Sequence, residues 1–130
     1  MSLKYEKEIT ANLERAEESL NAARELLRKA YYNVAASRAY YTVFYAATAL
    51  LLCEEMTFRK HTEVIASIHK HFVKTGRIDP QYGKDLNWLF ELRGVSDYGV
   101  IVRVPQPDAE RAVKAAAEFL HMIKGLITKY

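Results

Sequence analysis

The stretch from Tyr31 to Cys53 constrains the fold more than any other part of the chain. It carries one charged residue, Arg38, and contains neither glycine nor proline. Its alanines and leucines favour a helix, and a helix that is apolar on most sides must be enclosed by neighbouring helices. The longest uncharged run, Ala39 to Cys53, is shorter than the ~20 apolar residues of a membrane span and includes three tyrosines. The stretch therefore predicts the central helix of a helical bundle and no association with a membrane.

Helical periodicity also marks the segments on either side. Apolar residues at three- and four-residue steps predict a long amphipathic helix over Lys4–Ala30 and a shorter one over His61–Lys74, which Gly76 would end. A fourth helix is expected to start near Pro80 and to weaken near Gly94. The glycines, prolines and β-branched residues of Gly94–Pro107 predict a loop, after which Asp108 would cap a fifth helix that runs to about Thr128. The fold class predicted is all-α: one domain over residues 1–130, an antiparallel up-and-down bundle of four to five helices.

Composition limits the classes of function. The 130 residues include a single cysteine, Cys53, which excludes an internal disulfide framework and a four-cysteine zinc site and suits a reducing cytosol. We therefore expect a cytoplasmic protein. The formal net charge of +3 is compatible with a nucleic-acid partner. The histidines, for example His69 and His71, lack the spacing of a helical metal site, and no glycine-rich phosphate loop is present. We expect neither a metal nor a cofactor.

Polar side chains are gathered on one side of the predicted central helix. At 100° per residue, they fall within an arc of about 100°: Ser37, Arg38, Tyr41, Tyr45 and Thr48. Two interpretations remain open. In one, the tyrosines pack with their hydroxyl groups at the edge of the core and Arg38 pairs with a carboxylate. In the other, the stripe forms a polar groove that binds a ligand.

A second informative stretch runs from Phe90 to Gly99, at the expected end of the fourth helix. If helical turns continue past Gly94, Arg93 and Asp97 lie one turn apart and can pair. The pair could simply close the helix end. Alternatively, Arg93 could bind a phosphate group, because a guanidinium donates two parallel hydrogen bonds to phosphate oxygens.

These stretches together resemble the HEPN domain family, specifically its small single-domain, UPF0332-like group from archaea and bacteria. The resemblance covers nearly the whole chain. It rests on four short motifs: Ser37-Arg38-Ala39-Tyr40-Tyr41, Lys60-His61, Lys70-His71-Phe72-Val73-Lys74-Thr75-Gly76, and Leu92-Arg93 followed by Ser96-Asp97-Tyr98. It implies a helical bundle that forms a homodimer, and many relatives are metal-independent endoribonucleases whose cleft lies between the two copies. Several act as toxins beside a nucleotidyltransferase antitoxin.

The resemblance also suggests roles for individual residues. Arg93 occupies the position of the family's arginine, whereas the position of its histidine is occupied by Tyr98, after four intervening residues. A tyrosine, with a pKa near 10, is a poor base at neutral pH, so activity would be weak. In an endoribonuclease, Arg93 and Arg38 would bind phosphate and Tyr98 and Asp97 would carry or orient protons. The residues expected to line the cleft are Ser37, Arg38, Tyr41 and Tyr45.

The sequence leaves two other functions open. The same cleft could belong to a binding module without catalytic activity, which binds RNA or a nucleotide or docks a nucleotidyltransferase. Tyr98 would then be the candidate acceptor for nucleotide transfer, by analogy with some relatives. The third alternative is a purely structural helical dimer that binds no ligand. Whether the protein is an enzyme is therefore not decided by the sequence.

Overall fold

The computed structural model describes the backbone of residues 4–98 and 103–130, and the side chains of these residues except 95–98. Over this part of the chain the fold is built from helices, and we label five α-helices and one π-helical turn. They are α1 (Glu6–Arg28), α2 (Tyr32–Cys53), α3 (His61–Ile68), η1 (His69–Val73), α4 (Pro80–Tyr98) and α5 (Gln106–Ile127). The predicted all-α bundle is confirmed.

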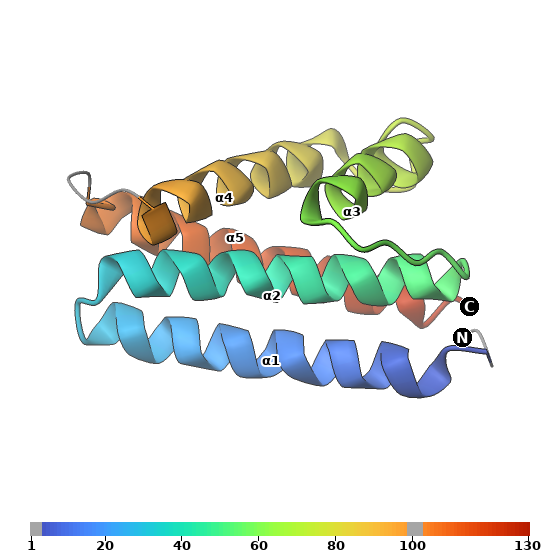
Figure 1. Cartoon of the computed structure of the whole chain (residues 1–130), viewed down its shortest axis with the longest axis horizontal. Helices are drawn as coiled ribbons and strands as arrows, with labels where there is room; N and C mark the ends of the chain where they lie inside the picture. Colours follow the sequence, from blue (N-terminus) through green and yellow to red (C-terminus); the bar gives the residue numbers. More distant parts are fainter. Residues whose placement is uncertain (1–3, 99–102) are drawn as a thin grey trace.

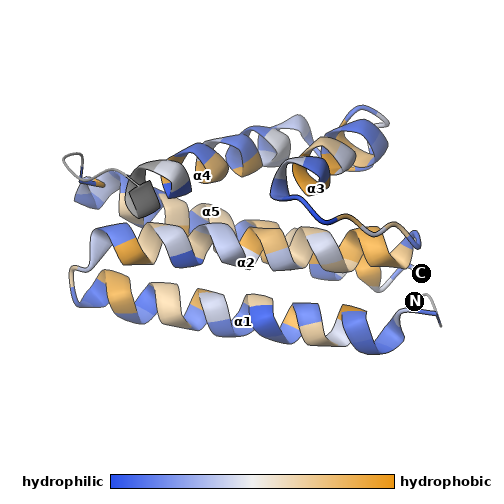
Figure 2. Ribbon diagram, viewed as in Figure 1, coloured by the Kyte–Doolittle hydropathy of each residue, from blue (hydrophilic) through white to orange (hydrophobic). Residues whose placement is uncertain are grey.

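Helix α2 lies at the centre of the bundle. It packs against α1, α3, α4 and α5, and α3 and α4 lie on the side of α2 away from α1 (Figure 1). Tyr40, Val43 and Leu50 on α2 are fully buried. Figure 2 shows that α2 is mostly pale or orange, whereas α1 is largely blue on the side turned away from α2. The low charge of this stretch is thus explained by neighbours on several sides, as predicted.

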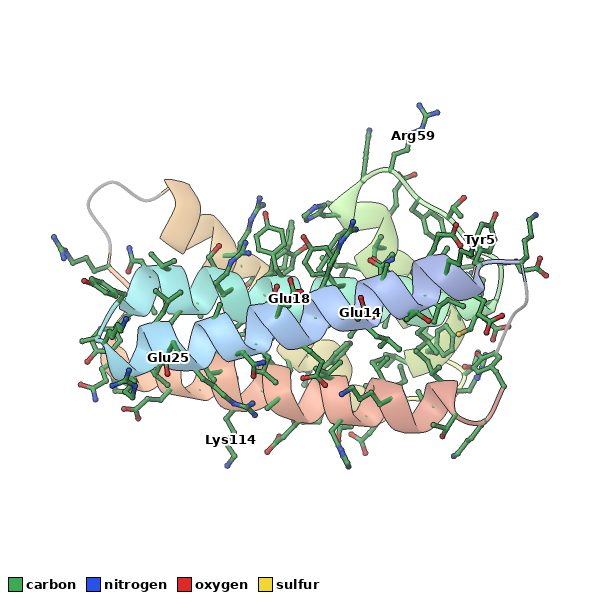
Figure 3. The ribbon with its side chains drawn as sticks, turned by 90° about the horizontal axis from the view of Figure 1, so that it is seen from below. Tyr5, Glu14, Glu18, Glu25, Arg59 and Lys114 are labelled. Carbon is green, nitrogen blue, oxygen red and sulfur yellow. The ribbon has the colours of Figure 1, made fainter. Side chains whose placement is uncertain are left out.

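Helix α1 covers one side of α2 and presents its charges to solvent. Glu14, Glu18 and Glu25 are exposed and lie along the helix in Figure 3. Arg59, in the connection that precedes α3, stands clear of the helices in the same view. No helix within the described residues has both the length and the apolar character needed to cross a membrane.

Three predicted boundaries need correction. The third helix does not stay α-helical to Lys74, because it changes to the π-helical turn η1 at His69. Helix α4 continues through Gly94 to Tyr98, so the expected loop from Gly94 is wrong in its first part. An internal glycine costs a helix only about 1 kcal/mol, and just before it Leu92 is buried and Arg93 is hydrogen-bonded to α2.

Helix α5 begins earlier than the predicted cap at Asp108. Its N-cap is Pro105, the first helical residue is Gln106, and Asp108 lies within the first turn. Pro107 therefore lies inside the first turn, where a proline is tolerated because its missing N–H would have had no helical partner. The backbone N–H of Val104 donates a hydrogen bond to Asn33 Oδ1 at 2.8 Å, which fixes the start of α5 against the start of α2.

Candidate functional site

Two arginines from different helices meet at one tyrosine of α2. Arg93, on α4, donates a hydrogen bond from Nη2 to the Tyr41 hydroxyl oxygen at 2.9 Å. Arg38, one turn before Tyr41 on α2, places its guanidinium carbon 4.6 Å from the centre of the Tyr41 ring. Both arginines are partly buried. Two cations held beside one ring create a local positive potential that favours an anion.

The surroundings of Arg38 bear on its predicted pairing with a carboxylate. No carboxylate in the described part of the chain forms an ion pair with Arg38, and its charged group rests on the face of Tyr41. The predicted pairing with a carboxylate is therefore not formed among these residues. A guanidinium keeps its charge at neutral pH, and among the described residues the structure places the face of the Tyr41 ring against it.

A third helix contributes a histidine beside the same tyrosines. The Tyr40 hydroxyl and His61 Nδ1 are hydrogen-bonded at 2.8 Å, and the His61 ring stacks on Phe44 with the ring centroids 3.9 Å apart. Burial raises the pKa of the Tyr40 phenol above its ordinary value. Burial, and secondarily the positive charge of Arg93, lower the pKa of His61. We call Arg38, Tyr40, Tyr41, His61 and Arg93 the arginine–tyrosine cluster.

Spacing between the histidines along the sequence does not predict these contacts of His61. The fold separates these residues: His69 Nε2 is hydrogen-bonded to Asn87 Oδ1 at 2.9 Å, and His121 is exposed on α5. Nowhere in the described part of the chain do three or more histidine, cysteine, aspartate or glutamate side chains come together as a metal site. The signal that could have found His61 is its position as the first residue of a helix that must pack on α2.

The polar stripe of α2 divides between two places. Tyr41 belongs to the arginine–tyrosine cluster, whereas Tyr45 lines a neighbouring groove of about 410 Å³ between α1, α2 and the connection before α3. The Thr48 hydroxyl also lines this groove and donates a hydrogen bond to the Phe44 carbonyl oxygen at 2.8 Å. Ser37 is buried. The groove is largely apolar, and Phe44 connects it to the cluster because it also stacks on His61.

Two predicted site residues lie at the end of α4. The backbone of Asp97 and Tyr98 is helical, so helical turns do continue past Gly94 as the predicted Arg93–Asp97 pair requires. Their side chains lie outside the described residues. The pair itself, and the roles of Asp97 and Tyr98 in moving protons or accepting a nucleotide, therefore stay predictions.

Comparison with known proteins identifies the family. The model of the HEPN domain matches residues 9–126, a span that includes all five α-helices in large part and the whole arginine–tyrosine cluster. The chain belongs to the HEPN domain family. The resemblance noted in the sequence is thereby confirmed.

Relatives and solved structures agree with this assignment. A UPF0332 protein of Thermotoga maritima is 38% identical over 87% of this chain and 86% of its own. The protein named "putative toxin MJ0142" of Methanocaldococcus jannaschii is 34% identical over 99% of this chain and 88% of its own. The crystal structure of ST0689, described as an archaeal HEPN homologue, has a TM-score of 0.73 at 18% identity and covers 92% of this chain and 97% of its own. The structure of TT1696 from Thermus thermophilus has a TM-score of 0.75 at 17% identity, covering 90% and 96%. These structures support the fold alone.

Proposed function

We propose that this HEPN protein binds RNA through its phosphate groups at the arginine–tyrosine cluster and acts as a metal-independent endoribonuclease. One observation carries the proposal. Arg38 and Arg93 come to the same Tyr41 from two helices, and Arg38 has no carboxylate partner in the described part of the chain. Guanidinium groups in this arrangement can bind two oxygens of one phosphate.

The surroundings of the cluster suit a polynucleotide. Arg59 and Lys60, directly before His61, are exposed. Positive charge around a phosphate site raises the rate and affinity of RNA binding at low salt. The groove lined by Phe44 and Tyr45 adjoins the cluster, and aromatic rings of this kind stack on unpaired bases. A single-stranded RNA could therefore contact both places at once.

The chemistry follows from the cluster together with the RNA itself. The 2′-oxygen of one nucleotide attacks the adjacent phosphorus and loses its proton, while the bond from phosphorus to the 5′-oxygen breaks and that oxygen takes up a proton. The products are a 2′,3′-cyclic phosphate and a 5′-hydroxyl. Arg38 and Arg93 would stabilise the negative charge that builds up on the phosphate oxygens. Asp97 and Tyr98 would carry or orient the protons.

The biological setting that we propose is a toxin–antitoxin pair. Three relatives from Methanocaldococcus jannaschii carry the name "putative toxin", which supports a toxin role for this chain. The partner would be a nucleotidyltransferase antitoxin, and two copies of the chain would form a homodimer whose clusters share one cleft. Sedimentation as a dimer at micromolar concentration is expected, and a monomer would contradict the shared cleft.

The deciding experiment measures cleavage of a mixed RNA substrate in EDTA. Wild-type protein should produce fragments with 2′,3′-cyclic phosphate ends, and Arg93→Ala should lower the rate roughly 10²–10³-fold, the typical effect of removing one group that stabilises transition-state charge. Lys114→Gln, an exposed change on α5, is the control and should cleave like wild type. Cleavage that survives Arg93→Ala in folded protein would refute the assignment of Arg93.

Absence of cleavage by every folded variant would favour the second function, a module modified by its partner. In that case the purified protein, mixed with the cognate nucleotidyltransferase and ATP, should gain the mass of one or more nucleotides. Tyr98→Phe should abolish the gain if Tyr98 is the acceptor. A mass gain that is unchanged in Tyr98→Phe would rule out this residue.

A further inference from the structure

The hydrogen bond between Tyr40 and His61 fixes which nitrogen of the histidine carries a proton. Tyr40 is 0% exposed, and within the described part of the chain the one hydrogen bond of its hydroxyl is to His61 Nδ1, at 2.8 Å. A buried hydroxyl group that donates no hydrogen bond destabilises the fold, because it has lost its hydrogen bond to water. Burial also raises the pKa of this phenol, which therefore stays protonated. Tyr40 is the donor, and Nδ1 accepts.

The other ring nitrogen of His61, Nε2, is therefore a hydrogen-bond donor. In a neutral imidazole, a nitrogen that accepts a hydrogen bond lacks a proton, so the single ring proton lies on Nε2. Burial and the charge of Arg93 lower the pKa of His61, which favours this neutral form at neutral pH. Stacking on Phe44, with centroids 3.9 Å apart, fixes the plane of the ring. Nε2–H therefore points away from Tyr40 in a set direction.

The position of His61 relates this donor to the arginines. The His61 ring centroid lies 5.8 Å from that of Tyr40 and 6.0 Å from that of Tyr41. The guanidinium carbon of Arg93 lies 5.7 Å and 5.6 Å from the same two centroids. His61 on α3 and Arg93 on α4 thus lie beside the same two tyrosines of α2. The His61 side chain is partly exposed, so a ligand can reach it.

We propose that neutral His61 is a phosphate-binding residue, which donates Nε2–H to a phosphate oxygen of RNA held by Arg38 and Arg93. The inference rests on the proposed function and adds a donor from α3 to that site. It also assigns His61 a role opposite to that of a general base, because a base would need its lone pair at Nε2. Tyr40 becomes a positioning residue that sets the protonated nitrogen of His61.

The first test reads the tautomer without any ligand. In ¹⁵N NMR spectra of the histidine side chains at pH 7.5, His61 should show the proton on Nε2, and Tyr40→Phe should weaken or remove that preference. His121, exposed on α5, is the internal reference. A proton found on Nδ1 of His61 in the wild-type protein would overturn the proposal directly.

The second test measures binding of a single-stranded 2′-O-methyl RNA, which cannot be cleaved, by fluorescence anisotropy in EDTA. The double variant Tyr40→Phe/His61→Phe keeps both rings and leaves no buried hydroxyl without an acceptor. It should bind about 10- to 100-fold more weakly, the usual effect of losing one hydrogen bond to a charged group. His61→Gln, which keeps an N–H donor at similar reach, should retain most of the affinity.

The outcomes distinguish a failure of the role proposed for His61 from a failure of the proposed function. If wild type binds, Arg93→Lys binds more weakly and the double variant binds like wild type, the role of His61 is refuted and the proposed function stands. If His61→Gln binds as weakly as the double variant while both remain folded, a donor at this position is not what matters, and the proposal also fails. If wild-type protein does not bind the RNA, both are overturned.

Discussion

Replacing Arg38 by glutamine tests whether the guanidinium of this residue contacts phosphate. Its guanidinium lies 4.6 Å from the centre of the Tyr41 ring and forms no ion pair with a described carboxylate. The substitution therefore removes one positive charge and one ring contact, and it leaves no described carboxylate without its ion-pair partner. A cation–π contact at a partly exposed site contributes about 0.5–1 kcal/mol, so the free energy of unfolding should fall by no more than about 1 kcal/mol.

The expected effect on RNA binding is larger and has a characteristic salt dependence. Losing one charge-assisted hydrogen bond should weaken binding of the 2′-O-methyl RNA roughly 10- to 100-fold at low salt. Each phosphate contact on a single strand contributes about 0.7 to the slope of log affinity against log salt concentration. Arg38→Gln should lower that slope by about 0.7. Raising the salt from about 50 to about 200 mM would then weaken the variant about 2.6-fold less than wild type.

Fluorescence anisotropy over this range of salt measures both quantities. Lys114→Gln removes the same unit of charge from the exposed face of α5, away from the cluster, and is the matched control. It should leave the slope near that of wild type. If the two variants change the slope equally, Arg38 acts only through the overall charge of the protein, and the proposed phosphate contact is wrong.

Two further predictions concern stability. A methyl group at Gly83 would lie 2.9 Å from His69 Cε1, so Gly83→Ala should lower the free energy of unfolding by roughly 1–3 kcal/mol. A methyl group at Gly125 would meet nothing within 4 Å, so Gly125→Ala should raise the free energy of unfolding by about 0.5–1 kcal/mol. Urea denaturation that ranks the two variants in the opposite order would contradict the packing of η1 on α4. The second prediction concerns pH. Burial and the charge of Arg93 lower the pKa of folded His61, so the unfolded chain binds the proton more readily, and the stability due to neutral His61 is complete above about pH 6.5 and is lost as the pH falls below it. His61→Gln should therefore lose less stability than wild type between pH 7.5 and 5, and equal losses would contradict the pKa shift.

Much of the fold could be predicted because its signals are local. The scarcity of charge from Tyr31 to Cys53 marked the central helix, and α2 spans Tyr32–Cys53. Gly76, predicted to end the third helical segment, has a φ of 79°, a conformation that glycine adopts at little cost. The wrong boundaries depended on contacts between distant residues. From the sequence alone, Gly94 predicts the end of a helix, because the hydrogen bond from Arg93 to Tyr41 that holds this part of α4 against α2 joins residues far apart in the chain.

The site was predictable in its residue types but not in its contacts. The sequence predicts Arg38, Tyr41 and Arg93 as site residues, yet the Arg93–Tyr41 hydrogen bond joins residues 52 positions apart. Helical periodicity gives the face on which a side chain lies, but not the residue of another helix that will meet it. The sequence places His61 in a family motif but not in the site, because spacing along one helix reveals pairs on that helix alone. Its contact with Tyr40 depends on how α3 docks on α2.

The placement of the cluster follows from the same feature that makes α2 central. A helix covered on several sides leaves its polar side chains between itself and another helix, and α3 and α4 both cover the side of α2 away from α1. Their polar residues His61 and Arg93 consequently converge on Tyr40 and Tyr41. The charge that burial would otherwise penalise is tolerated because the tyrosine rings and hydroxyl groups solvate it. The helix that holds the core together is thus also the one on which the groups that we propose bind phosphate are assembled. Any change that loosens α3 or α4 from α2 should therefore weaken RNA binding before it unfolds the bundle.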